Sequence, residues 1–192
     1  MLEELLNQKK TDSDILSKQF DQWLYKDRGR KIRVIEFFLN QRSENIDKLI
    51  RKAHDMSDLC SIKDFGIFSV GGYGRGELHP FSDIDLLLLS QSNLSTGEQK
   101  KIEKFISLLW DLGLDIGHSV RTLEQAKKQA REDIFTMTNM LEFRKLTGSE
   151  DLHKMYLDII DTKTYGEINH LFKKKLKSKS SAMKHSTTLL TI

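Results

Sequence analysis

Two aspartates separated by one residue are the side chains in this sequence best suited to do chemistry. Asp83 and Asp85 open an apolar stretch, DIDLLLL, which has the composition of a buried strand. Side chains alternate between the two faces of a strand, so both carboxylates project to the same side and can share a cation. Without a cation, their repulsion and partial burial would favour protonation of one of them. Carboxylate oxygens are ligands that Mg²⁺ prefers, which predicts a magnesium site, with Mn²⁺ as the alternative ion.

A glycine cluster precedes these aspartates. Gly71 and Gly72 end an apolar segment, and the absence of Cβ atoms lets their backbone N–H groups approach phosphate oxygens closely. A short helix beginning near Gly74 would add the partial positive charge of its N-terminus. Arg75 and His79 in the same loop are candidates to contact phosphate. The segment therefore predicts an anion site next to the carboxylates.

The residues around these glycines exclude two other phosphate-binding motifs. A Walker loop requires Gly-Lys-Ser or Gly-Lys-Thr, which does not follow them. The dinucleotide fingerprint G-x-G-x-x-G is not met either, because Gly72, Gly74 and Gly76 are spaced by twos. The glycines therefore indicate a different kind of nucleotide site.

Hydrophobic spacing predicts the elements that position these residues. Apolar residues three and four apart predict helices over 13–58, 96–112 and from 122 onward. Short β-rich runs predict strands over 65–70, 83–89 and 114–120. This order predicts an α/β or α+β fold, with a small mixed sheet and helices over it. We expect an N-terminal helical segment (1–60), a catalytic core (61–125) and a C-terminal helical segment (126–192).

The composition is that of a folded, water-soluble protein. Charged residues make up 31% of the 192 and hydrophobic ones 38%, and no apolar run approaches the roughly 20 residues of a membrane helix. The N-terminus lacks the pattern of a secretory signal and Cys60 is the single cysteine, so we expect a cytoplasmic protein. The net charge of +3 is too small to indicate a nucleic-acid partner. The basic run 173–179 is expected to be a solvated helix face or tail.

Two longer segments resemble a known family. GGYGRGELHPFSDIDLLLL, residues 71–89, has the Gly-Gly and Asp-x-Asp arrangement of the DNA polymerase beta-type nucleotidyltransferase superfamily. Together with WDLGLDIGHSVRTLEQA, residues 110–126, it resembles the N-terminal domain of the bacterial bifunctional PII uridylyltransferase/uridylyl-removing enzymes. The resemblance implies a polymerase beta-like nucleotidyltransferase core.

The resemblance also implies roles for individual residues. Asp83 and Asp85 would bind metal, and the superfamily's third carboxylate on the next strand would be Asp115 within Leu-Asp-Ile. The glycines would cradle the triphosphate. The further nucleotide-binding candidates are Arg75, Ser82 and Arg121, the last on the same strand face as Asp115 by alternation. Many members have serine after the first glycine, where this chain has Gly72.

The activity implied by the family is transfer of UMP from UTP to a tyrosine hydroxyl of the nitrogen-regulatory PII protein. The family's hydrolase and glutamine-sensing domains are expected to be absent from this chain, and removal of the nucleotide with them. Two other functions stay open: a non-catalytic remnant that binds a nucleotide or partner, and a stand-alone nucleotidyltransferase acting on RNA or another protein.

Structural explanations compete with these roles. Ser82 and Asp83 could merely cap a turn, although that leaves Asp85 inside an apolar strand. Asp115 could be an exposed acid at a strand start, and Arg75 and Arg121 ordinary surface arginines. His118 alternates with apolar neighbours, which favours a core histidine over a catalytic one. The pair His54-Asp55 is expected to lie on a helix surface.

Overall fold

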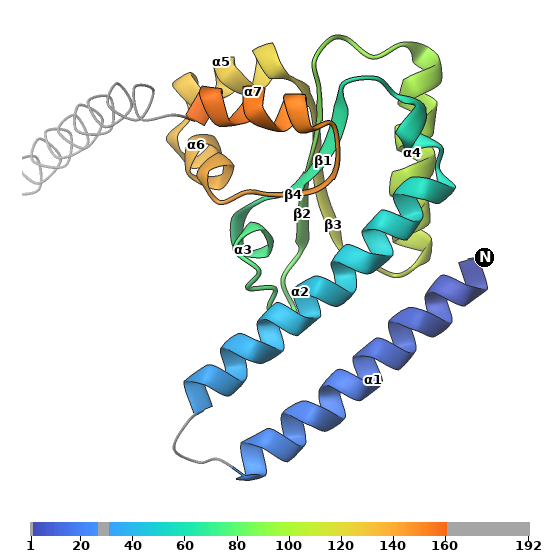
Figure 1. Ribbon diagram of the computed structural model, residues 1–192, viewed down its shortest axis with the longest axis vertical. Coiled ribbons are helices and arrows are strands. Elements are labelled where there is room, and N and C mark those ends of the chain that lie inside the picture. Colours follow the sequence, from blue (N-terminus) through green and yellow to red (C-terminus); the bar gives the residue numbers. More distant parts are fainter. Residues whose placement is uncertain (1, 27–30, 161–192) are drawn as a thin grey trace, which may run out of the picture.

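The computed structural model describes residues 2–26 and 31–160 (Figure 1). Two long helices precede the first strand, and helices then alternate with the strands of the sheet. The elements are α1 (Leu2–Lys26), α2 (Lys31–Met56), the 3₁₀ turn η1 (Leu59–Ser61), β1 (Phe65–Ser69), α3 (Gly71–Gly74), β2 (Ile84–Ser90), α4 (Thr96–Asp111), β3 (Ile116–Thr122), α5 (Leu123–Glu132), α6 (Ile134–Leu141), β4 (Arg144–Gly148) and α7 (Glu150–Ile160).

The four strands form one mixed sheet in the order β3-β2-β1-β4. Strand β1 pairs antiparallel with β2 and with β4, whereas β2 pairs parallel with β3. All five residues of β1 are buried, and so is every residue of β2 except Asp85. The predicted fold class, a small mixed sheet with helices, is confirmed.

The parallel pairing of β2 with β3 depends on the crossover through α4. The Ser95 side chain and Glu98 form a capping box that starts α4. The helix ends before Gly113, whose φ of +64° is the left-handed conformation that glycine adopts readily. The chain then enters β3 with Ile84 opposite Ile116. These local signals fix which residues of β3 lie beside the aspartates of β2.

Helices cover both faces of the sheet (Figure 1). One core joins α1, α2 and α4 to one face, with Ile50, Ile67 and Leu88 fully buried in it. The second core joins α5, α6 and α7 to the opposite face, around Phe68 and Tyr156. The long side chains of α2 therefore belong to the same core as the strands that carry the site.

One predicted element is wrong, because residues 144–148 form β4 within the stretch that the pattern assigned to helix. The strand has only five residues, and Leu146 is the single one that is fully buried. Such a short run gives no alternating signal, and pairing with β1 decides its conformation. The predicted short helix also begins earlier, at Gly71 and not near Gly74.

Some predictions fall on parts of the chain outside the described residues. The basic run 173–179 lies there, and so does the part of the predicted segment 126–192 that follows residue 160. The three-part division of the chain stays a prediction. No helix within 2–26 or 31–160 has both the length and the apolarity needed to cross a membrane.

Candidate active site

The two aspartates lie at the start of β2. Asp83 directly precedes the strand and Asp85 is its second residue, opposite Gly117 of β3. The Asp85 carbonyl accepts a hydrogen bond from the N–H of Val70 at 3.1 Å, which ties the strand start to the end of β1. Asp85 is the exposed residue of an otherwise buried strand. The apolar run thus carries two carboxylates to its solvent-facing mouth.

The Asp85 carboxylate lies between the glycine turn and β3. A Cβ placed on Gly117 would come within 2.5 Å of Asp85 Oδ1, and one placed on Gly71 would lie 3.8 Å from Oδ2. Both glycines therefore lie close to this carboxyl group, and the surrounding atoms partly bury it although the residue as a whole is exposed. That burial raises the pKa of Asp85, and the nearby charge of Asp83 raises it further.

The glycine turn is the short helix α3. Gly71 has a φ of +59°, which allows the chain to leave β1 and turn at once into a helix. Gly74 approaches another part of the backbone so closely that an added Cβ would lie 1.9 Å from the carbonyl oxygen of Glu142. The first N–H groups of a helix have no partners within it, so they are available to an anion.

A buried polar network that the sequence reasoning missed anchors this turn. Tyr73 of α3 donates a hydrogen bond from its hydroxyl to Asp47 of α2 at 2.6 Å. Arg144 of β4 pairs with the same carboxylate through both terminal nitrogens. Asp47 is only 4% exposed, so the guanidinium supplies the charge that its burial requires. Burial, followed by the charge of Asp47, raises the pKa of Tyr73 well above its ordinary value.

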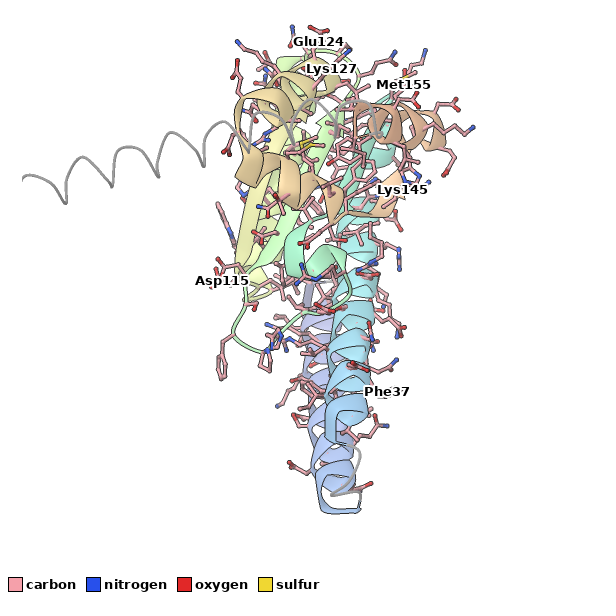
Figure 2. All side chains as sticks on the ribbon, turned by 90° about the vertical axis from the view of Figure 1, so that its left-hand side faces the viewer. Phe37, Asp115, Glu124, Lys127, Lys145 and Met155 are labelled. Atoms are coloured by element: carbon pink, nitrogen blue, oxygen red, sulfur yellow. The ribbon has the colours of Figure 1, made fainter. Side chains whose placement is uncertain are left out.

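Asp115 lies beside the start of β2, at one end of the sheet (Figure 2). Its carbonyl accepts a hydrogen bond from the N–H of Ile84 at 2.8 Å, so it is adjacent to Asp83 in the continued register. Its side chain is exposed and borders a cavity of about 570 Å³ that Ser82 also lines. Within residues 2–26 and 31–160, no group of three or more His, Cys, Asp or Glu side chains could hold a metal. Asp115 as a third ligand therefore stays a prediction.

The two predicted arginines have different surroundings. Arg75 pairs with Glu77 at 2.8 Å and also with Glu142, which raises its pKa, and its Nη2 would lie 3.7 Å from a Cβ on Gly72. It is therefore beside the turn but already neutralised. Arg121 is half-buried and lines a cavity of about 320 Å³. That cavity also contains Asp85, Gly117 and Ser119.

Three other expectations concern single side chains. His118 is exposed and not in the core, because α4 covers its face of β3 only partly. The ring centroids of His118 and Trp110 are 6.1 Å apart in a T-shaped arrangement. His54 is 6% exposed and not a surface residue, since it lies one helical turn after the buried Ile50 and contacts β4. Ser82 is exposed, and its N–H donates to the His79 carbonyl at 3.2 Å, as in a turn.

Comparison with known proteins shows which family the segment that carries the glycine turn and the aspartates resembles. Residues 46–139 match the family model described as nucleotidyltransferase domain. The chain is 43% identical over 147 residues to the bifunctional uridylyltransferase/uridylyl-removing enzyme of Pseudoalteromonas translucida, covering 76% of this chain and 17% of the relative. It is 42% identical over 134 residues to the enzyme of the same name from Pseudomonas fluorescens, covering 70% and 15%. The chain thus spans about one sixth of the length of these relatives.

Solved structures also show similarity. A toxin-antitoxin crystal structure with AMP-PNP has a TM-score of 0.40 and 20% identity, covering 68% of this chain and 98% of the other. A structure of a tri-AMPylated Shewanella oneidensis HEPN toxin in complex with MNT antitoxin has a TM-score of 0.39 and 17% identity, covering 71% and 98%.

The matched residues 46–139 include the glycine turn, Asp83, Asp85 and the whole of β3. They confirm the resemblance that residues 71–89 and 110–126 indicated. Residues 46–139 of this chain are therefore a nucleotidyltransferase domain, and it is similar to the corresponding domain of the bifunctional uridylyltransferase/uridylyl-removing enzymes.

Proposed function

We propose that this domain transfers UMP from UTP to a tyrosine hydroxyl of the nitrogen-regulatory PII protein, and that the reaction requires Mg²⁺. The observation that carries the proposal is the position of the Asp85 carboxylate, which lies between the Gly71 turn and Gly117 with Asp83 two residues before it. Carboxylates and an anion-binding turn at one strand mouth suit a metal-bound nucleoside triphosphate. The relatives named as uridylyltransferases support uridylyl as the group transferred.

The donor set fits a divalent cation. Burial and the charge of Asp83 both raise the pKa of Asp85, so its ionised form lacks compensation from the protein. A hard dication held by Asp83 and Asp85, and by Asp115 if its exposed side chain turns toward them, would supply that compensation. When bound, Mg²⁺ supplies charge that neutralises the triphosphate and favours ionisation of the attacking hydroxyl.

The chain's own residues contribute binding and orientation. The N–H groups at the start of α3 bind the triphosphate, while Tyr73 and its partner Asp47 hold the turn in position. The acceptor oxygen attacks the α-phosphorus in line, the bond between the α-phosphorus and the α,β-bridging oxygen breaks, and pyrophosphate leaves with that oxygen. Arg121 borders the cavity beside Asp85, and its positive charge can stabilise the negative charge on the α-phosphate of the transferred uridylyl group.

Arg75 needs a different role from a free phosphate ligand. Its guanidinium already pairs with Glu77 and Glu142 next to the Gly72 turn. A phosphate at the turn would therefore share the charge of Arg75 with two carboxylates, and the pairing with Glu142 joins the turn to the loop before β4. Of the two arginines, Arg121 has the environment better suited to a substrate contact.

The test is transfer of labelled UMP from UTP to purified PII protein in the presence of Mg²⁺. The parent chain is compared with Asp83→Asn and Asp85→Asn, and with Asp111→Asn, an exposed acid at the end of α4, as the matched control. We expect either site variant to lose at least about 100-fold in rate, since even outer-shell partners of a metal contribute about 10–100-fold.

The outcomes separate the proposal from its alternatives. Chelation by EDTA should stop transfer by the parent chain, and Asp111→Asn should behave as the parent. Equal rates in the parent and both site variants would contradict the proposal. Binding of UTP by calorimetry without transfer to PII would instead indicate a non-catalytic domain or another acceptor.

A further inference from the structure

Strand β3 is the edge of the sheet on the side of the candidate active site. Among the described residues it pairs only with β2 (Figure 2). The hydrogen bond from Ile84 N–H to the Asp115 carbonyl sets the alternation of the parallel ladder. Backbone groups of Gly117 and Ser119 consequently face β2, and those of His118 and Val120 face away from it. The outer edge therefore presents backbone donors and acceptors along β3.

This edge lacks the features that usually prevent pairing with another chain. The strand reads IGHSVRT, without lysine or proline, and it has seven residues. Its one permanently charged side chain, Arg121, lines the cavity that contains Asp85. An extended segment of another protein could hydrogen-bond to the outer backbone groups of β3, since the strand has neither a proline nor a lysine to prevent pairing.

Cavities lie on both faces of the same strand. On the active-site face, the cavity of about 320 Å³ contains Asp85 and Ser119. On the opposite face, a cavity of about 490 Å³ lies between β3 and α4, where Trp110 is 55% exposed and Val120 is 41% exposed. His118 and Arg121 line both cavities, so both cavities border the same strand.

We propose that the acceptor protein docks as an added strand on the free edge of β3. Its tyrosine side chain enters the cavity beside Asp85, and the side chain of the next or preceding residue enters the cavity formed by Trp110 and Val120. Neighbouring side chains of a strand point to opposite faces, which is why one extended segment fills both cavities. The proposal rests on the proposed function and defines its acceptor further: an exposed, extended loop with a tyrosine next to an apolar residue.

A helical acceptor segment fits these features less well. A helix satisfies its backbone groups internally, so it gains nothing from the outward-facing groups of His118 and Val120. Its neighbouring side chains also point about 100° apart, which does not place them on opposite faces of a strand. The paired cavities and the free edge therefore favour an extended segment.

The test is the steady-state kinetics of UMP transfer with PII protein as the acceptor. Val120→Pro removes an outward-facing N–H without removing a hydrogen bond to β2, whereas the control Val120→Ala keeps that N–H. Trp110→Ala removes a large apolar side chain from the wall of the cavity on the opposite face from Asp85. We expect Val120→Pro and Trp110→Ala each to raise the KM for the acceptor by about 10-fold or more, with the KM for UTP unchanged. Val120→Ala should have a smaller effect than Val120→Pro.

Two measurements keep the result unambiguous. Thermal unfolding of each variant checks that the fold is retained. If Val120→Pro does not fold, Trp110→Ala still tests the docking surface, because Trp110 is 55% exposed and its replacement leaves the backbone of β3 unchanged. Direct binding of PII to the Asp85→Asn chain should weaken with the same substitutions. Transfer by the parent with an unchanged acceptor KM in both variants overturns the docking surface alone. No transfer by the parent overturns the proposed function together with it.

Discussion

Replacement of Gly117 by alanine should separate the position of the Asp85 carboxylate from the stability of the fold. A Cβ at residue 117 would lie 2.5 Å from Asp85 Oδ1, whereas ordinary van der Waals contact begins at 3.4 Å. The oxygen must therefore retreat by about 0.9 Å. Only the end of a side chain has to move, so the free energy of unfolding should fall by about 0.5–1.5 kcal/mol, the cost of a shifted rotamer.

The effect of Gly117→Ala on the reaction should be much larger than its effect on stability. A displacement of about 1 Å in a group that positions the reaction costs about 100-fold in rate. We therefore expect a loss of about 100-fold in kcat/KM for UMP transfer, measured with PII and UTP under saturating Mg²⁺. Urea denaturation of the same protein should show a midpoint lowered only by the equivalent of about 0.5–1.5 kcal/mol.

Gly97→Ala provides the matched control. Gly97 lies in the first turn of α4, and an added Cβ there would meet no atom within 4 Å. This variant should keep its activity and gain up to about 1 kcal/mol in stability, since alanine favours helix more than glycine does. The reasoning fails if Gly117→Ala transfers UMP within about threefold of the parent rate, because the carboxylate position would then not matter.

Three further predictions concern the support and the charge of the site. Tyr73→Phe should lower the free energy of unfolding by about 1.5–3 kcal/mol in urea, because the buried carboxylate of Asp47 loses a hydrogen-bond donor. Asp83→Asn should lower the pKa of Asp85 in metal-free protein, since it removes a negative charge that raises this pKa; carboxyl-carbon NMR titration measures the shift. Because the pKa of Asp85 is raised in the folded protein, the free energy of unfolding is highest at acid pH and falls as the pH rises through that pKa. Asp83→Asn should make this fall in the free energy of unfolding smaller. Gly74→Ala should destabilise the fold by about 3 kcal/mol or more in thermal unfolding, because its Cβ would lie 1.9 Å from a backbone oxygen that cannot rotate away.

The sequence could predict those parts of the site that depend on local patterns. The spacing of Asp83 and Asp85 predicts their common strand mouth, and β2 begins there. The Gly71-Gly72 pair predicts a turn after a strand, which α3 provides. In both cases the residues that decide the geometry lie within a few positions of each other, so strand alternation and glycine conformations are sufficient to predict it.

Contacts between distant segments could not be predicted in this way. Arg75 looks like a free cation in its own loop, but Glu142, 67 residues later, pairs with it. Asp47 and Arg144 are 97 residues apart and meet beneath the glycine turn. Such pairs become apparent only when the sheet order is known. His54 is different, because its spacing of four from Ile50 on α2 was a signal for burial that the sequence contained.

Gly117 shows why the site needs register as well as motif. Alternation places it on the strand face of Asp115, but nothing in LDIGHSV indicates that it lies opposite Asp85. That register depends on the length of the α4 crossover, and hence on the cap at Ser95 and the left-handed turn at Gly113. A shift by one residue would place the side chain of Ile116 or His118 against the carboxylate. The capping signals of α4 therefore contribute to the candidate active site as the aspartates do, because they place Gly117, which leaves room for the Asp85 carboxylate.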